Sequence, residues 1–296
     1  MPQAIELTSN GGANSVRATV SVIGGALKSL VVGDTQLVGL TDNRLTSQFD
    51  GVVLAPWANR IDRGRWNYLG KELQLEANDK AFDNALHGLV TELIFDVVEQ
   101  TDHSVKLQTR VDSSPGYPFD LEILVSYELT NSGIRVTHSA KNVGDNAAPY
   151  VVGAHPYFQI SGTPIDQLEL KLAASTVHVV DDRKIPTGKV EILGTEFDAT
   201  SWRKLSDCNF DHGFGELLRD ANGNGHTYLR SSKGEQLDIW QSPEMQYTFI
   251  FTPSQAIAIE PQSAPANAFN SHEDLILLEP GGAHTASWGA ELSLNT

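Results

Sequence analysis

The sequence predicts an all-β protein, built as a large antiparallel β-sandwich. Apolar and polar residues alternate along many short segments, turn residues separate these segments, and almost no stretch has a sustained helical period. No linker, low-complexity tract or run of like charges divides the 296 residues. We therefore expect a single domain that covers residues 1–296.

Short strands are expected throughout the first half of the chain. Residues 16–22 have the period of a half-buried strand, which Gly24-Gly25 ends. His138 falls in another alternating segment and is expected to be an ordinary residue of one strand face. A polar loop is expected at 41–50. The expected strands are 16–22, 26–32, 36–40, a buried strand from 51, a hairpin over 65–75, 93–99, 104–111, 119–129 and 134–140.

The second half continues this pattern around one irregular region. Residues 148–160 indicate a buried strand that runs into aromatic residues. Residues 181–226 have the weakest periodicity, and their first part, 181–188, has the composition of a loop. Further strands are expected at 227–231, 236–241, 246–251, 256–260, 274–278 and 283–294.

Composition excludes several classes of partner. The formal charge of −16 and the pI near 4.8 oppose binding to nucleic acids or anionic membranes, because both need clustered Lys and Arg. Cys208 is the only cysteine, the N-terminus has no signal-peptide pattern, and no apolar run approaches the roughly 20 residues that span a bilayer. We expect a cytoplasmic protein, a monomer or homodimer, that binds a neutral ligand.

Two titratable residues are expected where buried strands end. Glu260 follows the apolar residues 257–259, and Pro261, which cannot donate to a sheet ladder, is expected to end or kink the strand. Partial desolvation raises the pKa of a carboxyl in such a place and suits it to proton transfer. His155 also stands directly before a proline, and histidine exchanges protons near neutral pH. A solvated strand-end glutamate is the alternative for Glu260, and core packing explains the aromatic residues after His155 as well as sugar stacking does.

Three further polar residues lie in predicted loops. Arg60 has a fork of donors that suits sugar hydroxyls or a carboxylate, and a structural salt bridge is an equal alternative. His87 precedes Gly88, which leaves space around it, although a lone histidine in a loop is more often a packing residue. Asp211 on its own would be interpreted as a residue that caps a turn.

Several common catalytic motifs are missing from the sequence. It has no glycine-rich phosphate loop, no Gly-x-Ser-x-Gly elbow and no histidine pair at zinc-site spacing on a helix. Cys208 has no basic neighbour that would favour a thiolate. The remaining possibility is acid/base chemistry by Glu and His on a polar, mostly uncharged substrate.

Five short motifs resemble the aldose 1-epimerase (galactose mutarotase) family over nearly the whole chain. They are PWANRI at 56–61 with Gly64, NALHG at 84–88, HPYF at 155–158, FDHGF at 210–214 and EPQ at 260–262. The resemblance implies a β-sandwich with an open sugar-binding cleft across one sheet. It implies that Glu260 is the general base for the anomeric hydroxyl and that His155 is the acid that protonates the ring oxygen. It also implies that sugar hydroxyls are held by Arg60, His87 and Asp211.

The implied reaction agrees with the residue types. Opening a cyclic hemiacetal removes a proton from O1 and supplies one to the ring oxygen, and closure on the other face of the carbonyl reverses both transfers. An acid and a base on opposite sides of the ring suffice, each contributing on the order of 10²–10⁴-fold. No metal or organic cofactor is required. We therefore expect an isomerase, a mutarotase that interconverts the α and β anomers of a free aldose.

The preferred sugar stays open, because the residues around the two catalytic candidates depart from those of the better-known galactose mutarotases. Two alternative functions also remain. A hexose-6-phosphate epimerase on the same fold would need cations such as Arg63 and Arg65, and the acidic net charge disfavours it. A non-catalytic sugar-binding or sugar-sensing protein would not need both Glu260 and His155.

Overall fold

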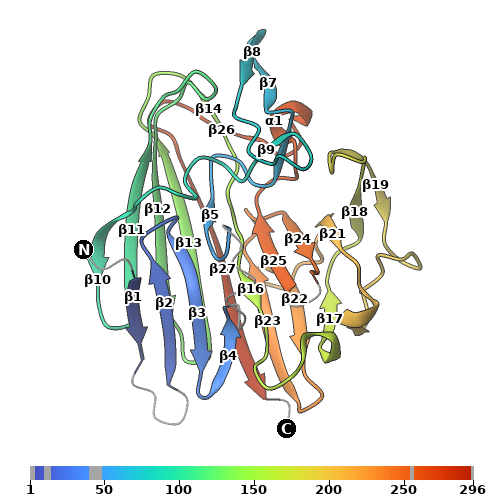
Figure 1. Ribbon diagram of the computed structural model, residues 1–296. Helices are drawn as coiled ribbons and strands as arrows, with labels where there is room; N and C mark the ends of the chain where they lie inside the picture. The colour runs from blue at the N-terminus through green and yellow to red at the C-terminus, as the bar shows by residue number, and fades with distance from the viewer. Residues whose placement is uncertain (1–3, 10–14, 40–48, 254–256, 295–296) are drawn as a thin grey trace.

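Two large antiparallel β-sheets pack face to face in the computed structural model, which describes residues 4–9, 15–39, 49–253 and 257–294 (Figure 1). The first sheet has twelve strands and the second has nine. The prediction of an antiparallel all-β fold is confirmed. Most of the expected loop at 41–50, and the ends of two expected strands at Leu40 and Ala256, lie outside the described residues.

The first sheet runs in the order β1-β2-β3-β4-β16-β25-β24-β21-β18-β19, and β15 pairs with both β25 and β5. Every pairing is antiparallel. The strand bounds are β1 Ala4–Thr8, β2 Val16–Ser21, β3 Ala26–Val32, β4 Thr35–Val38, β5 Val53–Leu54, β15 Gly153–Ala154, β16 Tyr157–Phe158, β18 Thr176–Val180, β19 Pro186–Glu191, β21 Asp211–Gly215, β24 Tyr247–Phe251 and β25 Ile257–Gln262.

The second sheet runs in the order β10-β11-β12-β13-β27-β23-β22-β17-β20. Its longest strands are neighbours at its centre, and their register is unbroken. The bounds are β10 Asp96–Gln100, β11 Ser104–Val111, β12 Leu121–Leu129, β13 Gly133–Asn142, β17 Glu169–Leu172, β20 Arg203–Lys204, β22 Gly225–Arg230, β23 Glu235–Gln241 and β27 Ala283–Leu294.

Three small two-stranded sheets cover one end of the sandwich, where Figure 1 shows them above the large sheets with the short helix α1. The described helices are α1 and two single 3₁₀ turns. The bounds are β6 Arg60–Asp62 with β9 Asn84–Leu86, β7 Arg65–Tyr68 with β8 Lys71–Gln74, β14 Ala148–Tyr150 with β26 Ile276–Leu278, α1 Ala268–Ser271, and 3₁₀ turns at Ile165–Gln167 and Leu205–Asp207.

The core between the large sheets follows from the alternation in the sequence. Along β12, every second residue is buried and its neighbours are half-buried or exposed. Phe158 of the first sheet meets Trp288 of the second edge to face, with ring centroids 6.5 Å apart. Both side chains are buried, and full burial of one large apolar side chain contributes about 1.5–3 kcal/mol.

His138 belongs to this core. It lies on the inward face of β13, is buried, and its Nε2 accepts a hydrogen bond from Trp288 Nε1 at 3.0 Å. Burial, and then the proximity of His284, lower the pKa of His138 to about 3. The ring is therefore neutral at physiological pH and acts as a packing residue.

Two sequence-based expectations about strands are wrong. The region of weakest periodicity contains β19 and β21, whose pairing is supplied by neighbouring strands. Pro261 does not end its strand, because β25 continues to Gln262 with Thr248 opposite Pro261. On the other side of β25, the Ile259 N–H points to Pro156 in the gap between β15 and β16. Because Pro261 is two residues after Ile259, the N–H that proline lacks would point to that same side. The hydrogen bonds between β25 and β24 are therefore kept.

No helix in the described part of the chain is long and apolar enough to cross a membrane.

Candidate active site

A cavity of about 410 Å³ opens on the first sheet, over β25 and the strands beside it. All five candidate residues from the sequence line it, although they come from positions spread over 200 residues. The complete lining is Phe49, Asn59, Arg60, Phe82, Leu86, His87, His155, Tyr157, Lys184, Asp211, Phe249, Phe251 and Glu260.

Strand β25 separates the core from the cavity. Its odd-numbered residues Ile257 and Ile259 belong to the main core, whereas Ala258 packs with Tyr157 in a separate small cluster. Glu260 is two residues after Ala258 and therefore lies on the cavity face of the strand. Phe249 of β24 is directly opposite Glu260. The pleat of β25 thus delivers a carboxyl group to the floor of the cavity.

Glu260 and His155 are in direct contact. His155 Nε2 lies 3.3 Å from Glu260 Oε1, and both side chains are buried. The other carboxyl oxygen, Oε2, accepts a hydrogen bond from Gln262 Nε2 at 2.9 Å. His155 lies in the gap between β15 and β16, two strands that both pair with β25. That gap, immediately before Pro156, places the ring beside the carboxyl group.

Burial shifts the pKa values of these two groups toward their neutral forms. Desolvation, with a smaller contribution from Asp211, holds the pKa of Glu260 well above its usual range, against the opposing effects of Gln262 and Arg60. Desolvation lowers the pKa of His155 to about 4. Burial therefore favours a proton on the carboxyl group of Glu260 over one shared with His155, whose imidazole is neutral at physiological pH.

Arg60 begins β6, and His87 directly follows β9, in the small β6–β9 sheet above the cavity. Arg60 Nε donates to Asp79 Oδ2 at 2.8 Å, and the guanidinium lies over the Phe82 ring. Arg60 therefore both forms a structural salt bridge and lines the cavity, so the two alternatives for this residue hold together. Asp79 accepts from Nε, and no described residue accepts a hydrogen bond from the terminal amino groups of Arg60.

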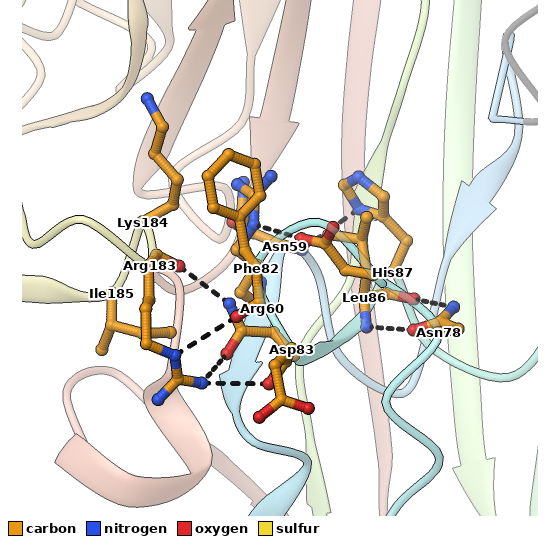
Figure 2. A network of polar contacts seen from close by, with 12 residues as sticks. Asn59, Arg60, Asn78, Phe82, Asp83, Leu86, His87, Arg183, Lys184 and Ile185 are labelled. Carbon is orange, nitrogen blue, oxygen red and sulfur yellow. Dashed lines mark hydrogen bonds and ion pairs between the residues drawn. The ribbon is translucent and has the colours of Figure 1, made fainter.

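His87 is held by the backbone of Asn59. The Asn59 N–H donates to His87 Nδ1 at 3.2 Å, and the His87 N–H donates to the Asn59 carbonyl at 3.0 Å (Figure 2). Both residues have positive φ, which lets the two segments that contain them turn toward each other. Burial, then His155 and Arg60, hold the pKa of His87 well below its ordinary value. A neutral ring that accepts at Nδ1 carries its proton on Nε2, so His87 is a hydrogen-bond donor.

This tautomer also bears on metal binding. His87, His155 and Glu260 offer ligand atoms that lie within 4.8 Å of one another. A metal needs a nitrogen lone pair, but the Nδ1 lone pair of His87 is used by Asn59 and Nε2 is protonated. The hydrogen-bonding of His87 therefore suits a hydroxyl acceptor better than a cation.

Asp211 begins β21, and its side chain meets a residue that the sequence did not indicate. Lys184 Nζ lies 2.8 Å from Asp211 Oδ2, and both side chains are partly exposed. Lys184 is in the loop between β18 and β19, which composition marked only as a loop. Its contact with β21 depends on how that loop folds over the sheet.

Other lining residues could have been found from strand pairing. Phe249 and Phe251 alternate along β24 and lie opposite Glu260 and Ala258 on the cavity face. Phe49 packs edge to face on His87, with ring centroids 4.7 Å apart, and no local pattern placed it there. Together with Phe82 and Tyr157 these rings give the cavity apolar walls around a polar floor, the usual composition of a small-molecule site.

The comparisons with known proteins agree with this fold. A family model described as aldose 1-epimerase matches residues 5–289. An uncharacterized Escherichia coli protein, YihR, is 33% identical over 92% of this chain and 89% of its own length. Human galactose mutarotase is 31% identical over 64% of this chain and 58% of its own length. The chain belongs to the aldose 1-epimerase family.

Solved structures show the same fold at lower identity. A GalM/aldose epimerase homologue from C. elegans superposes with a TM-score of 0.86 at 21% identity, over 99% of this chain and all of the other. Galactose 1-epimerase from Lactobacillus acidophilus superposes with a TM-score of 0.80 at 20% identity, over 98% of this chain and 95% of the other.

Proposed function

We propose that this protein is an aldose 1-epimerase that interconverts the α and β anomers of a free aldose by acid/base ring opening and closure. The observation that carries the proposal is the contact of His155 Nε2 with Glu260 Oε1, at 3.3 Å, on the floor of a cavity of about 410 Å³. A monosaccharide fits a space of this size. The mode of assembly (monomer or homodimer), the single domain over residues 1–296 and the cytoplasmic location remain parts of the same proposal.

The contact between the two groups changes one detail of the expected mechanism. The sequence suggested an acid and a base on opposite sides of the ring, but the two side chains are neighbours. The anomeric hydroxyl and the ring oxygen are both bonded to C1, so their protons are handled within a small volume. A contacting acid/base pair can therefore serve both oxygens from one side.

We assign the general base to Glu260 and the general acid to His155. These roles need the proton to be on the imidazole, whereas burial favours it on the carboxyl group of the empty site. Sugar hydroxyls that donate to Glu260 would stabilise its carboxylate and move the proton to His155. Ring closure reverses both transfers and restores the starting pair.

The remaining candidate residues are assigned to binding. His87 offers Nε2–H, Arg60 offers its terminal amino groups, and Asp211 offers carboxylate oxygens, which together match donors and acceptors on sugar hydroxyls. The aromatic walls can pack on the apolar face of a pyranose. The hexose-6-phosphate alternative loses support, because Arg63 and Arg65 are exposed and neither lines the cavity.

The test is α/β interconversion of glucose, galactose, xylose and glucose 6-phosphate, followed by polarimetry or NMR exchange. Wild-type protein should accelerate at least one neutral sugar above buffer, and Glu260→Gln should lower kcat by on the order of 10²–10⁴-fold while sugar affinity stays within a few-fold. Glutamine keeps the shape and cannot ionise, so Glu260→Gln should be at least as stable as wild type at neutral pH. Sugar binding without acceleration would favour the sensing alternative, and a fully active Glu260→Gln would remove the assigned base.

A further inference from the structure

Lys184 is a cation in the cavity that the proposed mechanism does not use. It lines the cavity beside Asp211, yet it comes from the tight loop between β18 and β19, at the far edge of the first sheet. Lys184 has a φ of 64°, in the left-handed region where a lysine is uncommon. The Asp181 carboxylate holds the loop closed by accepting from the Arg183 and Ile185 N–H groups, each at 2.9 Å.

Arg183 anchors this loop to the opposite wall of the cavity. Its guanidinium donates to Asp62 Oδ1 at 2.6 Å, to the Asp83 carbonyl at 3.0 Å, to Asn84 Oδ1 at 2.7 Å and to the Phe82 carbonyl at 3.2 Å. Asn84, which is fully buried, returns a hydrogen bond to the Arg183 carbonyl at 2.8 Å. Figure 2 shows Arg183 facing the segment of Phe82 and Asp83 while Lys184 extends away from it. These hydrogen bonds of Arg183 thus fix the backbone from which Lys184 reaches Asp211.

The ion pair leaves hydrogen-bonding capacity directed at the cavity. The ammonium group has three donors, and its one polar contact among the described residues is Asp211 Oδ2. Asp211 Oδ1 accepts no hydrogen bond from a described residue. The side chains are 29% and 24% exposed, so a ligand can reach both groups. Together they present donors and an acceptor side by side.

A sugar hydroxyl matches such a pair, because it can accept from Lys184 and donate to Asp211 at the same time. An anionic substituent matches it less well. Such a substituent could accept from Lys184, but it would lie against the negatively charged Asp211 carboxylate. To take the place of that carboxylate it would have to break the 2.8 Å contact between Lys184 Nζ and Asp211 Oδ2. The pair is neutral as a whole, and it therefore favours a neutral sugar.

We propose that Lys184 is a specificity-determining residue of this site, that the Lys184–Asp211 pair binds one sugar hydroxyl as donor and acceptor together, and that Arg183 is the positioning residue that holds Lys184 in place. This inference rests on the proposed function for its substrate class. It adds a contact that depends on the β18–β19 loop and assigns that loop a role in substrate selection.

The experiment uses the best neutral aldose from the interconversion assay, its monodeoxy analogues and the methyl glycosides of glucose, galactose and xylose. Lys184→Met should lower kcat/KM for the parent sugar by on the order of 10- to 100-fold, since hydrogen bonds to charged groups are the strong ones. One deoxy analogue, which lacks the hydroxyl in question, should be turned over by Lys184→Met and wild type at rates within about threefold. Asp211→Asn should likewise have no effect on kcat/KM for that same analogue. The effects of the two substitutions on kcat/KM for the parent sugar should be non-additive.

Arg183→Lys tests the positioning role. Lysine keeps the charge but lacks the fork that reaches four acceptors, so the variant should reproduce the analogue profile of Lys184→Met although residue 183 does not line the cavity. Lys189→Met is the matched control. Lys189 lies on the same hairpin, pairs with Glu273 at 2.9 Å and does not line the cavity, so kcat/KM should stay within about twofold.

Several results would overturn the inference. These are an unchanged Lys184→Met, an equal loss on every deoxy analogue, or a wild-type preference for glucose 6-phosphate that depends on Lys184. Calorimetric binding of the methyl glycosides of glucose, galactose and xylose, which cannot open their rings, separates the two proposals. If no sugar is turned over, the mutarotase proposal fails, and Lys184→Met must still weaken binding of at least one of these glycosides by on the order of 10-fold for the inference to stand.

Discussion

Two buried histidines of this protein have pKa values shifted in the same direction but lie in opposite surroundings. His155, between strands β15 and β16 of the first sheet, has a pKa lowered to about 4, and His138, in β13 of the second sheet, has a pKa lowered to about 3. The main cause is burial in both cases. His155 contacts a carboxyl group and faces a cavity, whereas His138 accepts a hydrogen bond from Trp288 inside the core. A lowered pKa therefore identifies a buried ring, and only the partner and the open space beside it indicate proton transfer.

The same substitution at both positions gives the largest expected contrast. His155→Leu should lower kcat by on the order of 10²–10⁴-fold through loss of the acid. His138→Leu should leave kcat within about twofold but reduce the free energy of unfolding by about 1–3 kcal/mol, because Trp288 Nε1 loses its acceptor. The measurements are anomer exchange and urea unfolding of each variant. A catalytic loss in His138→Leu with unchanged stability would show that the two histidines had been assigned the wrong way round.

The residues above the cavity are expected to have a smaller effect, on binding. Arg60→Ala and His87→Ala should each raise KM by on the order of 10- to 100-fold, because each removes a donor to a sugar hydroxyl. Asp79→Asn is the control for Arg60, since it weakens the ion pair at 2.8 Å without changing a cavity residue. Its KM should change less than that of Arg60→Ala. A change in kcat alone for either alanine variant would contradict a binding role.

The smallest expected effect is the dependence of stability on pH. The folded pKa values of His138 and His155 are lowered, so the unfolded chain takes up protons below pH 6.5 that the folded chain does not. The contribution of these two histidines to the free energy of unfolding is therefore constant above that pH and falls as the pH decreases toward about 4, by about 1.4 kcal/mol per pH unit for each histidine. Glu260, whose pKa is raised, contributes with the opposite sign, so the comparison of variant with wild type isolates His138. Measured by urea unfolding between about pH 7 and about pH 5, the increase of the free energy of unfolding per pH unit should be smaller for His138→Leu than for wild type by about 1.4 kcal/mol. Equal slopes would mean that His138 titrates normally in the folded protein.

Regular strands could be predicted from the sequence because their signal is local. Alternation placed 104–111 and 283–294 correctly, since the pleat alone determines which side chains face the core. It failed at β21, where Asp211 lines the cavity and two of the five residues are glycines, so polar and apolar side chains do not alternate. It also failed at Pro261, because a proline is tolerated only through the gap in the neighbouring strand, which the local sequence does not contain.

The sequence by itself determined the all-β class, the resemblance to a sugar-epimerase family and five of the residues that line the cavity. Each of these depends on local alternation or on residue types in short motifs. Only the tertiary structure decided that Glu260 and His155 touch, that His87 is a fixed donor and that Lys184 reaches Asp211. Those contacts join segments up to about a hundred residues apart, and they exist because two strands flank β25 with a gap between them and Arg183 ties a distant loop across the cavity. Proton affinity and hydrogen-bond direction depend on such neighbours, so they could not be deduced from the order of residues along the chain.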